Sequence, residues 1–188
     1  MNTLHIDYQK TALILIDLQK GIVAMPGGNE VVEKAVKLVD LFRQNNGFIS
    51  FVRVSFLDGK DVLKPLIDEF VPTPTNRPID WDELVPELGV TEKDYVITKR
   101  QWGAFFGTDL DLQLRRRGID TIVLCGIATN IGVESTAREA FQFGYNQIFI
   151  TDAMTTFSEE AHQASIQFIF PRIGKSRTTA EFLTQVRG

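Results

Sequence analysis

Short apolar runs alternate with amphipathic stretches along most of the chain. The runs are rich in β-branched residues and short enough to be strands buried on both faces, whereas the stretches between them repeat apolar residues at helical spacing. This alternation favours right-handed crossovers, which build a parallel sheet covered by helices on both faces. We therefore predict an α/β fold with three layers, in which a six-stranded parallel sheet is flanked by helices.

The predicted elements can be placed along the chain. The strands are Thr11 to Asp17, Phe48 to Val54, Tyr95 to Thr98, Thr121 to Gly126, Gln147 to Thr151 and a weaker Arg172 to Ser176. The helices are Asn29 to Asn45, Thr108 to Arg117, Ile131 to Phe143, Ser158 to Ile169 and Ala180 to Val186. Thr178 and Glu181 have the spacing of a capping box before the last helix. The segment from Leu57 to Val90 holds most of the prolines and little periodicity, which predicts a lid, a rim or an oligomer contact.

The composition is typical of a globular protein, with 44% hydrophobic and 23% charged residues in a chain of 188. We expect a single domain over residues 1–188, because no linker divides the chain. The net charge of −4 argues against nucleic acid or an anionic membrane as the main partner. The stretch from Met1 to Lys10 lacks the features of a signal peptide, and the one cysteine fits a reducing compartment, so we expect a cytoplasmic protein.

Candidate site residues follow the strands. Ligands of open parallel sheets bind at the carboxyl ends of the strands. The first strand ends with Asp17, Lys99 follows the third, and the fourth leads to Gly132 at the start of a helix, where Asn130 is a plausible N-cap. Backbone amides and the helix dipole at such a point suit a carboxylate, a phosphate or a developing oxyanion. An ordinary strand–helix unit without a ligand is the alternative.

Three motifs resemble those of the isochorismatase-like hydrolases, whose superfamily also contains nicotinamidases and carbamoylsarcosine amidases. They are Ile16-Asp17-Leu18-Gln19, then Lys99 followed by Gly103-Ala104-Phe105-Phe106-Gly107-Thr108, then Cys125-Gly126-Ile127-Ala128-Thr129-Asn130. The motifs fall in the family's order, and the similarity extends from about Thr11 to Thr178. The resemblance implies a Rossmann-like strand order, a homo-oligomer (dimer or tetramer) and a cis peptide bond between Ile127 and Ala128.

The resemblance also implies site residues. Amidase members have a catalytic aspartate, lysine and cysteine; Asp17 matches the aspartate, Lys99 matches the lysine, and Gly132 stands in place of the cysteine. True isochorismatases also carry glycine there, and they cleave a vinyl ether without covalent catalysis. This chain is similar to that branch, but it lacks the glutamine those enzymes place after the second strand and reads Val54-Ser55-Phe56-Leu57 instead.

We therefore predict a small-molecule hydrolase that acts without a covalent intermediate on a small anion, either an enol ether or an amide. Asp17 would be the acid or base, with a pKa raised by burial and restrained by Lys99. The backbone amides of Ala128 and Gly132 would hold the developing negative charge. The alternative is a structural ion pair between Asp17 and Lys99 without turnover.

Further predicted substrate contacts are Gln19, Trp102, Phe105, Thr129 and Asn130. The three aromatic residues Trp102, Phe105 and Phe106 would wall the pocket, although core packing is the simpler explanation for at least one of them. Arg100 is expected to point outward into solvent.

Other chemistry is less well supported. Cys125 lies within an apolar strand and is predicted to be an inert core residue. Only His5 and His162 exist, and neither has a partner at ligand spacing, so we expect no metal site and no cofactor. A catalytically inactive relative that binds a metabolite or a protein partner is the alternative function, because both the nucleophile and the glutamine are missing. A residual amidase that activates water directly is a third.

Overall fold

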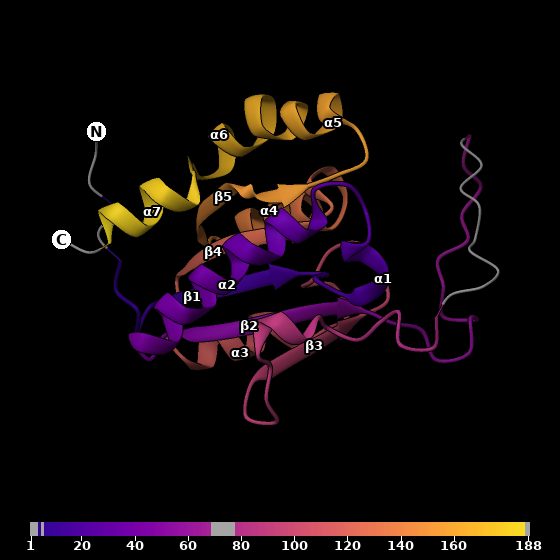
Figure 1. Cartoon of the computed structure of the whole chain (residues 1–188), viewed down its shortest axis with the longest axis horizontal. Coiled ribbons are helices and arrows are strands. Elements are labelled where there is room, and N and C mark those ends of the chain that lie inside the picture. Colours follow the sequence, from indigo (N-terminus) through magenta and orange to yellow (C-terminus); the bar gives the residue numbers. More distant parts are fainter. Residues whose placement is uncertain (1–3, 5, 69–77, 187–188) are drawn as a thin grey trace.

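The computed structural model describes residue 4, residues 6–68 and residues 78–186. Its parallel sheet has the order β3-β2-β1-β4-β5-β6 (Figure 1), which confirms the predicted six-stranded Rossmann-like arrangement. The strands are β1 (Thr11–Ile16), β2 (Phe48–Val54), β3 (Tyr95–Lys99), β4 (Thr121–Ile127), β5 (Asn146–Thr155) and β6 (Lys175–Arg177). The helices are α1 (Lys20–Val23), α2 (Gly28–Gln44), α3 (Leu110–Arg116), α4 (Glu134–Gln142), α5 (Glu159–Ala164), α6 (Phe170–Ile173) and α7 (Thr179–Gln185).

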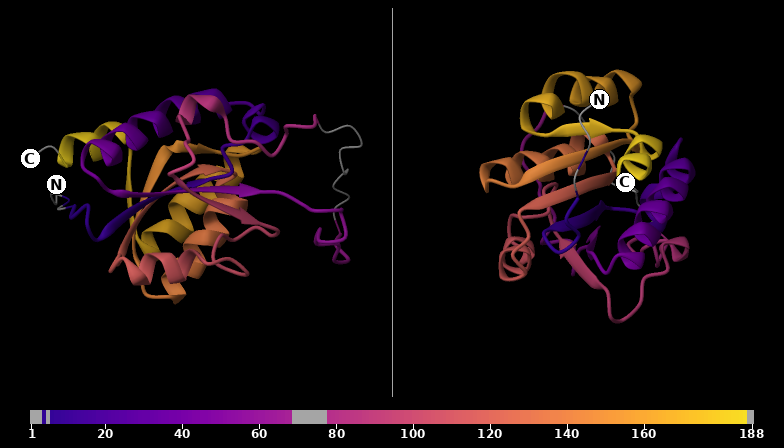
Figure 2. Two further views of the ribbon diagram at one scale, coloured as in Figure 1. Left: turned by 90° about the horizontal axis from the view of Figure 1, so that it is seen from below. Right: turned by 90° about the vertical axis from the view of Figure 1, so that its left-hand side faces the viewer.

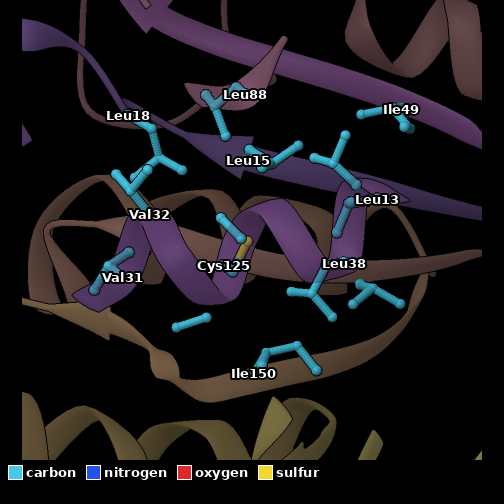
Figure 3. Close-up of a cluster of buried hydrophobic side chains, with 14 of the residues drawn as sticks. Leu13, Leu15, Leu18, Val31, Val32, Leu38, Ile49, Leu88, Cys125 and Ile150 are labelled. Carbon is cyan, nitrogen blue, oxygen red and sulfur yellow. The ribbon is translucent and has the colours of Figure 1, made fainter. Parts of the chain in front are cut away.

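Side chains of β1 alternate between two hydrophobic clusters, one on each face of the sheet. Leu13 and Leu15 pack with α2, which buries one side along its whole length (Figure 3). Ile14 and Ile16 pack on the other face, with buried residues of α3, α4 and α6. Because every residue of β1 is buried, the strand is the centre of both clusters. Figure 2 shows the resulting helix layers on either side of the sheet.

The last strand begins later than predicted. Arg172 belongs to α6 instead of a strand, and β6 starts at Lys175. Pro171 favours the first turn of a helix, and the ring of Phe170 stacks on Phe149 of β5 with centroids 4.1 Å apart. These two residues hold a short helical turn against the sheet before the chain enters the strand.

Two predicted helices begin or end with a wider π-helical turn. Residues Thr129–Val133 (η2) form such a turn before α4, and residues Ser165–Ile169 (η3) form another after α5. The residue that precedes η2 is Ala128, so the prediction that Asn130 is the N-cap is wrong. The capping box before α7 is confirmed, since Thr178 and Glu181 exchange both hydrogen bonds.

The proline-rich segment after β2 has little regular structure. Its one helical turn in the described residues is η1 (Pro86–Leu88), and residues 69–77 lie outside the described part. The described parts extend beyond the sheet, on the right in Figure 1, and expose apolar side chains such as Leu66 and Ile79. None of the helices in the described ranges is both long and apolar enough to cross a membrane.

Candidate active site

Three stretches that are distant in sequence meet where the strands end. Asp17 follows β1, Lys99 is the last residue of β3, and Gly132 lies in η2 after β4. Lys99 Nζ is 2.7 Å from Asp17 Oδ2. A Cβ atom placed on Gly132 would lie 3.1 Å from Asp17 Oδ2 and 3.4 Å from Lys99 Nζ. The structure therefore brings together the acid, the cation and the glycine at one edge of the sheet.

Asp17 has an unusual backbone for a residue with a side chain. Its φ of 52° lies in the left-handed region, where aspartate and asparagine are tolerated better than most residues. Its amide donates a hydrogen bond to the carbonyl of Val52 on β2, 2.9 Å away. This conformation ends the regular alternation of β1 and holds the carboxylate beside Lys99 instead of continuing the strand.

The carboxylate of Asp17 is buried, and its two oxygens have different surroundings. Oδ2 faces the Lys99 ammonium, whereas Oδ1 has no hydrogen-bond partner in the described part of the chain. Burial raises the pKa of Asp17 to about 6, although the nearby Lys99 acts in the opposite direction. The group can therefore carry a proton under mildly acidic conditions, and Oδ1 is where that proton would sit because Oδ2 accepts from Lys99.

Lys99 is almost completely buried, with 2% of its side chain exposed. Its Nζ also donates a hydrogen bond to the carbonyl oxygen of Trp102, at 2.7 Å. The ammonium has three protons, so these two partners leave one available for a ligand. Lys99 thus holds both the acid and the turn that carries Trp102.

A cavity of about 600 Å³ opens above these residues. Of the predicted site residues it is lined by Asp17, Lys99, Trp102, Ala128 and Gly132. The remaining lining is mainly apolar and comes from α1 and its flank (Gly21, Ile22, Met25), from the end of β2 and the segment after it (Val54, Phe56, Val62, Leu63, Trp81), and from Ile127, Ile131 and Phe157, with Arg100 and Gln101 as its further polar members. The cis peptide bond between Ile127 and Ala128, which the resemblance implied, is present at the edge of this cavity.

Two predicted substrate contacts have structural surroundings instead. Gln19 is buried, and its side-chain amide exchanges two hydrogen bonds with the backbone of Val54, at 2.7 and 2.9 Å. It therefore joins the chain after β1 to the end of β2 and is not among the residues lining the cavity. Phe105 packs in the core against Phe143 and Tyr145, with ring centroids 5.4 and 5.7 Å away. The predictions that these two residues line the pocket are corrected accordingly.

Thr129 and Asn130 also lie outside the cavity lining. The hydroxyl of Thr129 is 2.8 Å from Nδ1 of His162, and the residue is fully buried. The side-chain oxygen of Asn130 accepts a hydrogen bond from Thr156 at 2.7 Å. Both residues therefore connect η2 to the region around α5.

Arg100 and Trp81 line the cavity but were not predicted to do so. Arg100 was expected to point into solvent; 40% of its side chain is exposed, but its guanidinium also donates to the carbonyl of Ser55 at 2.7 Å and pairs with Asp61 at 2.8 Å. Trp81 stacks on Phe56 with ring centroids 6.1 Å apart. Trp81 lies in a segment without periodicity, so nothing in the local sequence marks it as a cavity residue. Arg100 directly follows Lys99, and this position could have indicated that it lies near the cavity.

The described residues contain no group of three or more His, Cys, Asp or Glu side chains suited to hold a metal ion. Cys125 is buried within β4, and burial raises the pKa of its thiol to about 12. It belongs to the hydrophobic cluster around α2 (Figure 3), where it packs as a small apolar residue.

Comparison with known proteins places these features in a family context. The isochorismatase domain profile matches residues 11–181. The chain is 71% identical over 188 residues to YwoC, an uncharacterized isochorismatase family protein of Bacillus subtilis (strain 168), with both chains fully covered. It is 41% identical over 191 residues to the ureidoacrylate amidohydrolase RutB of Acinetobacter baylyi, covering 94% of this chain and 72% of RutB. A solved structure of an isochorismatase family protein from Burkholderia thailandensis superimposes with a TM-score of 0.92, at 44% identity and with both chains fully covered.

Proposed function

Since this chain belongs to the isochorismatase family of hydrolases, we propose that it hydrolyses a small organic molecule without forming a covalent intermediate. One observation carries the proposal: the position that lies within reach of both Asp17 and Lys99 is a glycine, which has no nucleophilic side chain. Water must then supply the attacking oxygen. The cavity above Asp17 has room for a small substrate and for that water.

Asp17 is the proposed general acid. With Oδ2 held by Lys99, a neutral Asp17 carries its proton on Oδ1 and can deliver it to the substrate. For an enol ether, the proton goes to the vinyl carbon, water adds to the resulting cation, and the hemiketal collapses with release of an alcohol. For an amide, the ionised carboxylate takes a proton from the attacking water instead.

Backbone amides of the turn after β4 are the proposed binding site for developing negative charge. Ala128 and Gly132 both line the cavity, and Ala128 directly precedes η2, so both amides lie where the positive end of the helix dipole meets the cavity. A glycine at position 132 preserves this role because only its backbone is needed. Lys99 adds a positive charge at the same end of the cavity.

A substrate screen tests the proposal. The panel consists of small enol ethers, esters and amides, including unsaturated ureido amides because of the similarity to a ureidoacrylate amidohydrolase. Turnover that disappears in Asp17→Asn supports the hydrolase. The alternative function is a catalytically inactive relative that binds a metabolite or a protein partner, and it is favoured by tight ligand binding without turnover of any compound that binds.

We also propose that the protein acts in the cytoplasm as a dimer or tetramer. The family resemblance supports an oligomer, and the segment after β2 exposes several apolar side chains. Light scattering coupled to size-exclusion chromatography measures the mass, and a monomer at micromolar concentration would contradict the oligomer.

The acid role predicts the pH dependence of activity. The folded pKa of Asp17 is about 6, above the ordinary value of 3.8, so the protonated form is lost as the pH rises through about 6. We expect kcat/KM for an enol ether to be highest below pH 6 and to fall above it. A profile that rises through pH 6 would show that the ionised form is required, and would assign Asp17 as a base.

A side chain introduced at Gly132 tests whether the reaction needs the space beside Asp17 and Lys99. A methyl group at this position would lie 3.0 Å from Ile16 Cγ2 and 3.1 Å from Asp17 Oδ2, closer than ordinary packing. We expect Gly132→Ala to lower kcat/KM about tenfold or more and to lower the free energy of unfolding by about 1 to 3 kcal/mol. Ser135→Ala, in α4 and outside the cavity lining, is the control for both measurements. Unchanged activity in Gly132→Ala would show that the space is not used.

A further inference from the structure

The cavity has two cationic lining residues, and they are not equivalent. Lys99 is buried and its ammonium is engaged by Asp17 and by the Trp102 carbonyl. Arg100 is the next residue in the chain, and 40% of its side chain is exposed. Within the described residues, Arg100 is therefore the one lining cation that is not committed to the proposed catalytic carboxylate.

The guanidinium of Arg100 is held in place but not saturated. Nη1 donates to the carbonyl of Ser55 just after β2, and Nε lies 2.8 Å from Asp61 Oδ2. A guanidinium carries five N–H donors in a planar fork, so donors on Nη2 are available for a second acceptor. The Ser55 contact fixes the position of the fork, which is the arrangement that favours bidentate binding of a carboxylate.

Asp61 is an internal anion already bound to this fork. Its carboxylate also accepts a hydrogen bond from the amide of Leu57, which contributes most to holding its pKa below the ordinary value. The pair with Arg100 is partly exposed on both sides, so its attraction is weakened by solvent screening. Asp61 itself is not among the residues lining the cavity.

Much of the cavity wall is aromatic and apolar. Trp81 stacks on Phe56, and both line the cavity together with Trp102 and Phe157. The backbone of Trp81 is fixed against α1, since Gly21 donates a hydrogen bond to its carbonyl oxygen. Aromatic walls of this kind favour a planar, largely apolar ligand.

We propose that the cavity accepts a planar, largely apolar molecule that carries one carboxylate, and that Arg100 binds this carboxylate in exchange for Asp61. The inference deepens the proposed function by naming a substrate class for the same cavity. It places the anionic group of the substrate at the edge of the cavity, so that the reacting group reaches Asp17 and Gly132 at its base.

Binding of two isosteric probes tests the proposal. Phenylacetate and phenylacetone have the same shape, differ in charge, and contain no bond that a hydrolase can cleave. The chain has two tryptophans, Trp81 and Trp102, and both line the cavity, so their fluorescence reports occupancy directly. We expect the native protein to bind phenylacetate about fivefold or more tightly than phenylacetone, as a charge-assisted hydrogen bond would produce.

Variants of Arg100 and Asp61 test whether these residues cause the preference for phenylacetate. Arg100→Gln should bind the two probes equally, and Asp61→Asn should bind phenylacetate more tightly than the native protein because the competing carboxylate is gone. Arg116→Gln, an equal change of charge on α3, should behave like the native protein. Equal binding of both probes to the native protein, or a preference that survives in Arg100→Gln, overturns the assignment. An unchanged affinity in Asp61→Asn overturns the exchange.

The binding test is independent of turnover. If the substrate screen finds no activity but binding depends on Arg100, the proposed hydrolysis fails and the ligand class stands. If turnover is found but depends neither on a carboxylate in the substrate nor on Arg100, the ligand class fails and the hydrolase stands. Circular dichroism of each variant confirms that the fold is retained.

Discussion

Replacing Asp17 by asparagine should lower kcat/KM by about 1000-fold, within the range that a general acid or base contributes. Asparagine keeps the shape of the side chain and tolerates the left-handed backbone at this position, where φ is 52°. It cannot deliver or accept the proton that hydrolysis requires. The measurement is steady-state kinetics on the substrate identified by the screen, with circular dichroism to verify the fold.

Asp94→Asn is a matched control for this experiment. Asp94 also pairs with a cation, Arg43, at 3.0 Å, but it precedes β3 and so lies at the opposite end of the strands from the cavity. Its replacement should leave kcat/KM unchanged. If Asp17→Asn retains more than about a tenth of the native kcat/KM, Asp17 contributes less than a general acid should, and its pairing with Lys99 is structural.

Replacing Lys99 by methionine should lower the free energy of unfolding by about 3 to 5 kcal/mol at pH 8, the cost of removing one partner from a buried ion pair. Methionine fills a similar volume but leaves the Asp17 carboxylate buried without a cation, and Oδ1 already has no hydrogen-bond partner in the described residues. Urea unfolding at pH 5 and pH 8 measures the effect.

Lys99→Met should lower the free energy of unfolding less at pH 5 than at pH 8. The folded pKa of Asp17 is raised to about 6, and Lys99 lowers it, so removing Lys99 raises it further. A carboxyl group with a raised folded pKa stabilises the fold below its unfolded pKa, and that contribution is lost as the pH rises through the folded value. At pH 5 the double variant Asp17→Asn, Lys99→Met should have nearly the same free energy of unfolding as Lys99→Met alone. At pH 8 the double variant should regain most of the free energy of unfolding that Lys99→Met loses.

Lys20→Met provides the comparison for a pair on the surface. Lys20 contacts Asp80 and Glu83 at 2.8 and 2.7 Å, distances like that between Lys99 and Asp17, but 38% of its side chain is exposed. We expect Lys20→Met to lower the free energy of unfolding far less than Lys99→Met does, because exposed ion pairs are screened by water. If the two lysine variants lower the free energy of unfolding equally, burial does not make the Lys99 pair more important than a surface pair.

Much of the fold was predictable from local patterns. Strand and helix periodicity identified all six strands, and only the last was displaced, because the stacking of Phe170 on Phe149 is a tertiary contact between α6 and β5. The N-cap at Asn130 was wrong for a related reason. A π-helical turn depends on how the chain enters the helix from β4, and no residue pattern in the sequence marks it.

The edge of the sheet where the site forms also followed from the sequence. Asp17, Lys99 and Gly132 each come at or just after the carboxyl end of a predicted strand, and parallel strands bring such ends together. The sequence did not predict as well which neighbouring side chains line the cavity. Gln19 and Phe105 belong to the matching motifs, yet one binds the backbone of β2 and the other packs in the core.

The sequence by itself determined the order of the six strands and of five of the helices, but not the short α1 and α6, together with the chemistry at the strand ends and the absence of a nucleophile at Gly132. These depend on residue type and spacing along the chain. Only the tertiary structure decided that Asp17 Oδ1 lacks a hydrogen-bond partner among the described residues, that Arg100 lines the cavity and that Trp81 forms part of its wall. Those features arise where the regular strands have ended, so side-chain direction no longer follows a period and is set by contacts between distant segments.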